Sequence, residues 1–227
     1  MGDPINAIRF FNEKEVDELM VLDITASKER REPNFALIEE FASECSMPLA
    51  YGGGITNVEQ ATRLLSLGVE KICIQTLALQ DLRLLSRHVD RSGSQSVMAS
   101  VDVKRNWLGR SQLHGPAAGK AWSEPWMEIT QQLVTAGAGE ILLNAVERDG
   151  ALSGPDFELI REAAESMSVP LIAVGGIASL ADIKAAADAG ASAIAAGIFF
   201  VFHGPHRAVL ITYPNYHQLM NLFKATE

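Results

Sequence analysis

Asp102 is the residue of this chain best placed for acid–base chemistry. It follows the apolar run 97–101, which is typical of a buried strand, and it precedes Lys104 and Arg105. Burial would raise the pKa of this carboxyl group, whereas the neighbouring cations would lower it. The sequence therefore predicts a catalytic acid or base at Asp102. The alternative is a structural ion pair with Lys104 or Arg105.

Asp23 has a similar setting, at the end of the apolar run 19–22. It could carry chemistry, or it could cap the following segment through Thr25 and Ser27. The sequence leaves both interpretations open.

Two glycine runs, 52–54 and 175–176, follow apolar segments. Glycine lets backbone N–H groups approach an anion, and a following helix N-terminus adds a favourable dipole. Thr76 could add a hydroxyl donor beside the first run, and Gly197 lies where it would border the second. We interpret the runs as two phosphate sites for a small bisphosphorylated substrate. The alternative is that these glycines only make tight turns.

Three charged residues, Glu18, Lys71 and Glu140, stand at the opposite, amino-terminal ends of predicted strands. Buried charges must be paired or hydrogen-bonded. We expect either a salt cluster that closes the floor of the fold or a gate into its central axis.

The elements that position these residues alternate between strand and helix along the chain. Seven apolar runs without polar alternation predict buried parallel strands: 19–22, 48–51, 71–74, 97–101, 141–143, 170–174 and 193–196. Amphipathic segments such as 57–67 and 180–189 predict helices, which Gly68 and Gly190 close. The interruption 106–120 predicts a loop or small hairpin on the strand that ends near Val103. The fold class is therefore α/β with right-handed crossovers.

An internal repeat with a constant offset of 122 residues joins the two glycine runs. The pattern at 48–55 returns at 170–177, Gly68 returns as Gly190, and Glu18 as Glu140. Chance likeness between generic strand–helix units is the alternative. The repeat predicts one domain over residues 1–227, a (β/α)₈ TIM barrel of two half-barrels. The partner of the strand near 97 would precede Met1, so the first barrel strand is expected to be missing.

Composition limits the function classes. The 227 residues carry 19 Lys and Arg against 28 Asp and Glu, a net charge of -9, which argues against nucleic acid and anionic membranes as partners. The start has no signal-peptide pattern and no apolar run has the length of a membrane span, while two cysteines in apolar stretches favour a reduced, cytoplasmic setting. The spacing of His203, His206 and His217 predicts no metal site. We expect no cofactor.

The motifs together resemble the cyclase subunit of imidazole glycerol phosphate synthase, a lyase-type enzyme of histidine biosynthesis. The resemblance covers nearly the whole chain and rests on GDP (2–4), DEL (17–19), LDITAS (22–27), GGGI (52–55), GSQ (93–95), Asp102 with Lys104 and Arg105, GAGEILL (137–143), RDG (148–150) and the glycines 175–176. The segment FFVFHGPHRAVL (199–210) looks more like cyclase paralogues associated with amidination of surface polysaccharide.

The resemblance implies a glutamine amidotransferase complex. A glutaminase subunit would dock under the barrel in a heterodimer, and its ammonia would pass up the axis. Ammonia would then attack a phosphoribulosyl-formimino aminoimidazole carboxamide ribotide. Cleavage and ring closure would give imidazole glycerol phosphate and aminoimidazole carboxamide ribotide.

The resemblance also assigns residues. Asp102 matches the second of the family's two catalytic aspartates, and Glu18, Lys71 and Glu140 match three of its four ammonia-gate residues. The positions that match its phosphate-binding residues are Gly54, Thr76, Asp149, Gly150, Gly176, Ala196 and Gly197.

The chain departs from the family pattern at three points. The strand-one aspartate and the fourth gate residue have no counterpart, and a phosphate-proximal asparagine is Gln75. The alternatives are therefore a non-cyclising paralogue that channels ammonia for amidination of a polysaccharide sugar, or an inactive truncated form.

Overall fold

A curved parallel sheet forms the centre of the molecule. The computed structural model describes residues 3–115, 125–204 and 206–224. The parallel strands lie in the order β1-β2-β3-β4-β6-β7-β8, and the short β5 pairs antiparallel with β4. All seven predicted strands are confirmed. Their bounds are β1 Leu19–Leu22, β2 Leu49–Gly52, β3 Lys71–Ile74, β4 Val97–Arg105, β5 Ser111–Leu113, β6 Glu140–Ala145, β7 Leu171–Val174 and β8 Ala193–Ala195.

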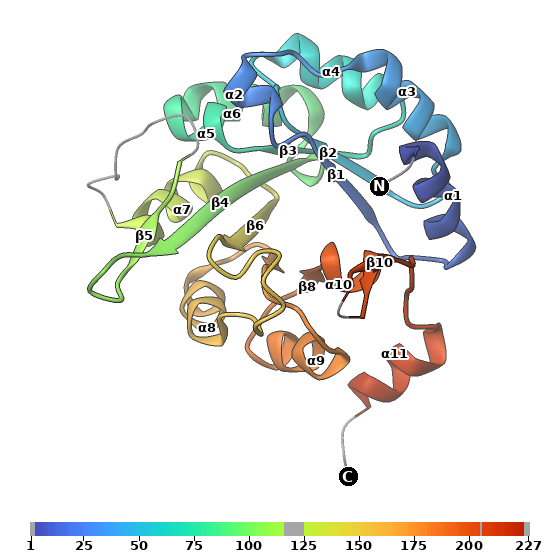
Figure 1. The fold of residues 1–227 in the computed structure, drawn as a ribbon. Coiled ribbons are helices and arrows are strands. Elements are labelled where there is room, and N and C mark those ends of the chain that lie inside the picture. The colour runs from blue at the N-terminus through green and yellow to red at the C-terminus, as the bar shows by residue number, and fades with distance from the viewer. Residues whose placement is uncertain (1–2, 116–124, 205, 225–227) are drawn as a thin grey trace.

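Helices cover the outer, convex face of the sheet, and the strands curve around an interior axis (Figure 1). This is the α/β arrangement that the sequence predicted, in the (β/α)₈ barrel class. The longer helices are α1 Pro4–Glu13, α3 Phe35–Glu44, α4 Val58–Ser66, α6 Leu82–Ser92, α7 Trp126–Thr135, α8 Phe157–Ser166, α9 Leu180–Asp188 and α11 Tyr216–Phe223. The shorter elements are α2 Ala26–Glu29, α5 Thr76–Gln80, the 3₁₀ turn η1 Ser94–Ser96, α10 Ile198–Val201, β9 Phe202–His203 and β10 Ala208–Val209.

The repeat seen in the sequence extends to the ends of the helices. Asn57 caps α4 by accepting from the backbone N–H of Gln60, and 122 residues later Ser179 caps α9 in the same way. Gly68 and Gly190 follow these helices with φ of +102° and +108°. Left-handed backbone of this kind strains residues that carry a Cβ, so glycine is the residue that ends both helices.

The expected hairpin after Val103 is confirmed by β5, which pairs with the end of β4. Residues 116–120 of the expected loop lie outside the described residues. Within the described ranges, β1 and β8 end the sheet path and are not paired with each other. The C-terminal segment approaches this opening, where the Tyr213 hydroxyl donates to the Asp17 carboxylate.

Two apolar clusters stabilise the sheet. The larger fills the space between the sheet and its helices, and it includes fully buried Ile72, Leu85 and Ile141. The smaller lies on the interior side of the strands and consists of Cys73, Met98, Leu142 and Ile172, with Met20, Val174 and Ala195 partly buried against it. Among the described helices, none combines the length and the apolar character that crossing a bilayer requires.

Candidate active site

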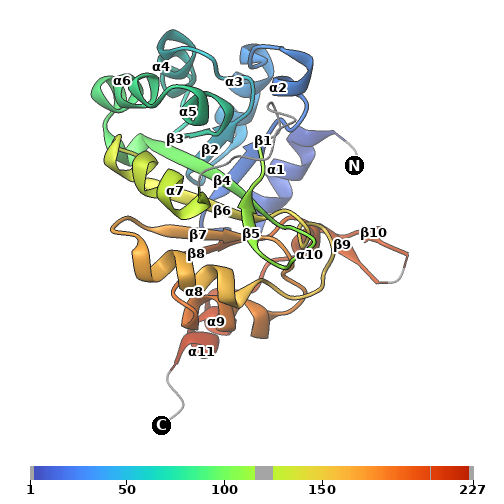
Figure 2. The ribbon, with the colours of Figure 1, turned by 90° about the vertical axis from the view of Figure 1, so that its left-hand side faces the viewer.

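The carboxyl ends of the strands bring the predicted chemistry to one end of the sheet, called here the mouth. Parallel strands all end on the same side, so residues at these ends converge although they are far apart in sequence. Asp102 on β4 stands directly beside Asn144 on β6 in the strand register. The β9–β10 hairpin projects from the body of the molecule after β8 (Figure 2).

Asp102 is held by a neighbouring amide and not by a cation. Asn144 Nδ2 donates to Asp102 Oδ1 at 3.1 Å. Arg105 instead pairs with Asp156 and Glu158, each at 3.0 Å. Alternation along β4 turns Arg105 to the opposite face of the sheet from Asp102. The ion-pair interpretation of Asp102 with Arg105 is therefore wrong, and Lys104 makes no salt bridge in the described part of the chain.

The surroundings of Asp102 raise the pKa of its carboxyl group. Burial is the main cause, because it penalises the charged form. The amides of Gln75 and Asn144 and the nearby His114 act in the opposite direction, while Asp149 adds to the rise. A carboxyl group with a raised pKa can hold a proton closer to neutral pH, which suits it for general acid–base catalysis.

Two polar atoms beside Asp102 are buried without a hydrogen-bond partner among the described residues. They are Gln75 Nε2 and Asn144 Oδ1. Gln75 lies close enough to lower the pKa of Asp102, yet its Nε2 makes no hydrogen bond of ordinary geometry. Unpaired buried polar groups cost free energy, so a donor and an acceptor are available here to a bound molecule. The sequence placed both residues at strand ends but gave neither a role beside Asp102; the pairing of Asn144 with Asp102 follows from the β4–β6 register.

The backbone of each glycine run packs closely against the carboxyl end of the preceding parallel strand, β1 for the first run and β6 for the second. These two contacts are called here the glycine junctions. A Cβ on Gly53 would lie 2.4 Å from Asp23 O, and a Cβ on Gly175 would lie 2.8 Å from Ala145 O. These carbonyl groups are themselves 122 residues apart. Gly176 is tighter, because a Cβ there would lie 2.2 Å from Gly154 O. The tight-turn interpretation of the glycines is therefore confirmed, and a phosphate role would be additional to it.

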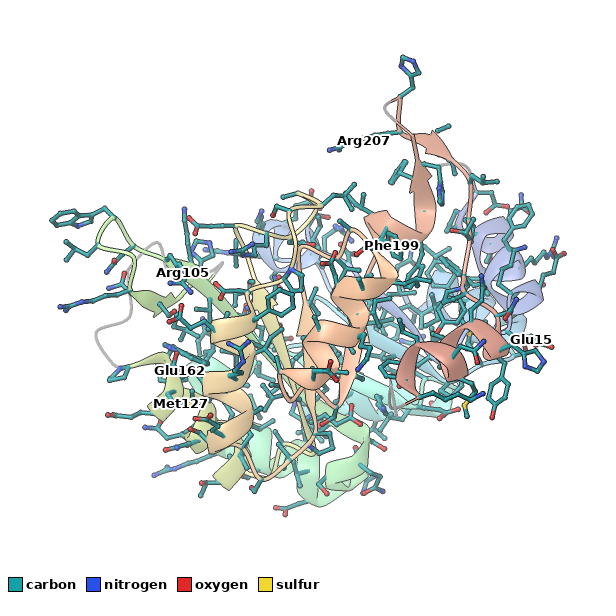
Figure 3. The ribbon with its side chains drawn as sticks, turned by 90° about the horizontal axis from the view of Figure 1, so that it is seen from below. Glu15, Arg105, Met127, Glu162, Phe199 and Arg207 are labelled. Carbon is teal, nitrogen blue, oxygen red and sulfur yellow. The ribbon has the colours of Figure 1, made fainter. Side chains whose placement is uncertain are left out.

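The second glycine run borders a cavity that is lined by the residues predicted for one of the two phosphate sites. The cavity is lined by Asp149, Gly150, Gly175, Gly176, Ala196 and Gly197, together with apolar neighbours that include Phe199. Figure 3 shows Phe199 near the root of the β9–β10 hairpin. At the first run, Gly54 and Thr76 follow the paired strands β2 and β3.

Asp23 serves as a cap. Its Oδ1 accepts from the Thr25 and Ala26 backbone N–H groups at 3.2 and 3.0 Å, and from Thr25 Oγ1 at 3.0 Å. Burial raises the pKa of Asp23, but these hydrogen bonds and Arg31 outweigh it and hold the pKa below its usual value. The capping interpretation is confirmed through Thr25. The sequence analysis did not anticipate Arg31, which pairs with Asp23 at 3.3 Å.

The three floor charges meet at the amino-terminal ends of the strands. Lys71 Nζ lies 2.9 Å from Glu18 Oε2 and 2.9 Å from Glu140 Oε1. Burial alone would lower the pKa of Lys71. Hydrogen bonds from its ammonium to both carboxylates outweigh that effect, so the net shift of the pKa is upward. The predicted salt cluster is confirmed; its role as a gate stays a prediction.

Within the described ranges, no three His, Cys, Asp or Glu side chains converge as metal ligands. His203, considered from the sequence, instead shares a hydrogen bond with Thr212 Oγ1 at 2.8 Å.

Comparison with known proteins gives one family. Residues 1–205 match the family described as histidine biosynthesis protein. A Pseudomonas aeruginosa protein, provisionally named imidazole glycerol phosphate synthase subunit hisF2, is 50% identical over 220 residues, which cover 96% of this chain and 88% of that protein. A Leptospira borgpetersenii protein, provisionally named as subunit HisF of the same synthase, is 44% identical, with 95% and 85% coverage. Subunit HisF of Thermobifida fusca is 37% identical, with 88% and 80% coverage.

Proposed function

The chain belongs to the histidine biosynthesis protein family, among the HisF-like cyclase subunits of imidazole glycerol phosphate synthase, and from that premise we propose that it joins ammonia from a glutaminase subunit to a bisphosphorylated substrate. Ammonia attacks the phosphoribulosyl-formimino aminoimidazole carboxamide ribotide. Cleavage and ring closure release imidazole glycerol phosphate and aminoimidazole carboxamide ribotide.

The observation that carries the proposal is the environment of Asp102. Its carboxyl group has a raised pKa and accepts from Asn144, at the mouth where both glycine junctions lie. Ammonia must lose protons as it forms bonds to carbon, and a carboxylate with a raised pKa accepts them more readily. General acid–base catalysis of this kind contributes roughly 10²- to 10⁴-fold in rate.

The two phosphates of the substrate are assigned to the two glycine junctions. Asp149, Gly150, Gly176, Ala196 and Gly197 would surround one phosphate. Gly54 and Thr76 would bind the other. The absence of side chains at most of these positions lets the phosphate reach backbone N–H groups directly.

The order of residues along the axis supports a path for ammonia. The Glu18–Lys71–Glu140 cluster forms the floor, an apolar cluster that includes Cys73 and Met98 lies inside the strands, and Asp102 lies at the mouth. A neutral molecule crosses an apolar interior at far lower cost than an ion. The proposed glutaminase therefore docks on the floor side in a heterodimer.

The test of the catalytic role is turnover with ammonia and the ribulosyl substrate. Asp102→Asn should lower kcat at least 100-fold, because it removes the titratable group while keeping its size. The matched control is Asp90→Asn, an exposed position on helix α6, which should retain wild-type turnover. Equal turnover in wild type and Asp102→Asn would contradict the assignment.

The test of the phosphate site uses Gly197→Ala. Gly197 has φ of −96°, and an added Cβ would meet nothing within 4 Å, so the fold accepts the methyl group. A phosphate held against this backbone would be displaced. Calorimetric titration with the bisphosphorylated substrate should therefore show weaker binding by tenfold or more, without loss of thermal stability. Unchanged affinity would place the phosphate elsewhere.

A second candidate is the non-cyclising paralogue that channels ammonia for amidination of a surface-polysaccharide sugar. Two observations favour it: the relatives at 50% and 44% identity carry provisional names, unlike the Thermobifida fusca protein at 37%, and Gln75 replaces an asparagine of the family pattern. The assay above separates the two. A chain that binds a glutaminase and stimulates it, yet does not consume the ribulosyl substrate, would favour the paralogue.

A further inference from the structure

The hairpin formed by the end of β4 and by β5 presents large apolar side chains to solvent at its tip. Trp107 is 90% exposed and Leu108 is 56% exposed. The hairpin extends away from the body of the molecule, on the mouth side of the sheet (Figure 1). Single exposed hydrophobic residues are common on proteins, but a nearly fully exposed tryptophan beside a leucine at the end of a projecting element needs a further reason.

The tip is held rigidly in this exposed position. Asn106 Oδ1 accepts from the backbone N–H groups of Leu108 and Arg110 at 2.9 and 3.0 Å. The backbone of Asn106 also bonds Arg110 O and Gly109 N. The turn is therefore preorganised, and ordering it on binding a partner costs little conformational entropy.

The root of the hairpin is fixed as firmly as its tip. Arg105, labelled at the root in Figure 3, donates to both carboxylate oxygens of the buried Asp156 at 3.0 Å and to Gly109 O at 3.2 Å. On the other strand, His114 N donates to Asp102 O at 2.7 Å. These contacts hold the whole hairpin on the scaffold that positions Asp102.

The charge of the hairpin is opposite to that of the chain. Residues 103–115 contain Lys104, Arg105 and Arg110 and no acidic residue, within a chain of net charge -9. Arg105 is neutralised by Asp156 and Glu158, whereas Lys104 and Arg110 are exposed and make no salt bridge in the part of the chain that the structure describes. The hairpin therefore combines two apolar groups at its tip with two available cations, Arg110 at the tip and Lys104 on β4.

We infer that the β4–β5 hairpin docks into an apolar pocket, rimmed by carboxylates, on a partner protein that approaches the mouth. Tryptophan and arginine are the residues most enriched at the energetic centres of interfaces. Nucleic acid fits less well, since two available cations on an acidic chain give little counterion release. A second copy of the chain is a separate outcome, which the experiment below distinguishes from a different partner protein.

The experiment begins with a photo-reactive probe in the cells that produce the chain. Trp107→p-benzoylphenylalanine should form a protein adduct on irradiation, whereas Glu39→p-benzoylphenylalanine, exposed on α3, should not form it. The adduct is identified by mass spectrometry, and that protein is then purified and titrated against the full chain by calorimetry.

Three variants then decide the inference. Trp107→Ala and Arg110→Glu should each weaken binding tenfold or more, and the affinity should fall with added salt. Gln112→Ala, exposed on the same hairpin, should change it less than twofold. The inference is overturned by any of four results: no adduct beyond the control, an adduct with nucleic acid, an adduct with a second copy of the chain, or unchanged affinity in Trp107→Ala.

Discussion

Replacing Lys71 by methionine tests how strongly the floor cluster stabilises the fold. Lys71→Met keeps the length of the side chain and removes only the ammonium group that bridges Glu18 and Glu140. Both contacts measure 2.9 Å, and the three side chains are between 20% and 31% exposed. The cluster is therefore neither fully buried nor freely solvated.

The expected cost follows from this partial burial. At an effective dielectric constant near 20, a pair of charges about 4 Å apart attracts with about 4 kcal/mol. Desolvation and screening cancel most of that attraction. The variant also leaves two carboxylates facing each other without a cation. We expect the free energy of unfolding to fall by about 2 kcal/mol, which lowers Tm by roughly 4–8 °C for a chain of this size.

The measurement is urea unfolding followed by circular dichroism, with Lys184→Met as the matched control. Lys184 pairs with Asp188 one turn along α9, also at 2.9 Å, but these side chains are 37% and 63% exposed. Such a surface pair contributes only about 0.3–0.5 kcal/mol. Equal urea midpoints for Lys71→Met and Lys184→Met, with an unchanged dependence of the unfolding free energy on urea concentration, would refute the argument that partial burial strengthens the floor cluster.

The pH dependence of the floor cluster has a definite sign. The pKa of Lys71 is raised in the folded state, so its contribution is complete below the pKa of an unfolded lysine, about 10.4. The contribution disappears as the pH rises through the folded pKa. The stability difference between wild type and Lys71→Met should therefore be constant from pH 6 to 9 and should shrink above that range.

Three further predictions concern other buried groups. Asp102→Asn should stabilise the fold increasingly as the pH rises above the unfolded aspartate pKa of about 3.9, with the gain levelling off above the folded pKa, because burial raises the pKa of Asp102 and makes its ionised form costly; urea midpoints of wild type and variant that differ by the same amount at every pH would contradict this. His88 is fully buried, neither ring nitrogen has a partner in the described chain, and burial lowers its pKa. His88→Leu should therefore stabilise the fold by about 1–2 kcal/mol. The gain should be larger at pH 5 than at pH 8, because protonation of His88 as the pH falls destabilises only the wild type. Gly176→Ala should destabilise by about 3 kcal/mol or more, since its Cβ would lie 2.2 Å from a carbonyl oxygen, whereas Gly109→Ala, with no atom within 4 Å, should cost only about 1 kcal/mol for its positive φ; equal melting temperatures would contradict the packing argument.

Much of the fold could be predicted because its signals are local. Unbroken apolar runs predicted the seven parallel strands, and glycine after an amphipathic run predicted the ends of α4 and α9. The repeat then supplied the topology, since matching half-barrels place matching turns at the same end of the sheet. The turn at 106–110 was also predicted as part of a hairpin, although the exposure of its tryptophan was not.

The site was harder to predict because its contacts depend on register and side-chain direction. The sequence placed Lys104 and Arg105 beside Asp102, but strand alternation turns Arg105 to the other face, where Asp156 binds it. Asn144 is 42 residues from Asp102, and only the alignment of β4 with β6 brings its amide to the carboxylate. The sequence singled out Gln75 at a phosphate-proximal position, but it did not indicate that Gln75 Nε2 and Asn144 Oδ1 are buried without a partner among the described residues.

The two glycine junctions have a consequence for how the molecule tolerates damage. Each half contains the same close backbone contact, which leaves no room for a Cβ, at Gly53 against Asp23 and at Gly175 against Ala145. Neither copy can relieve the other, because each closes a different strand onto its neighbour within one continuous sheet. The architecture is thus duplicated without being redundant: copying the half doubled the number of places where a single methyl group is harmful.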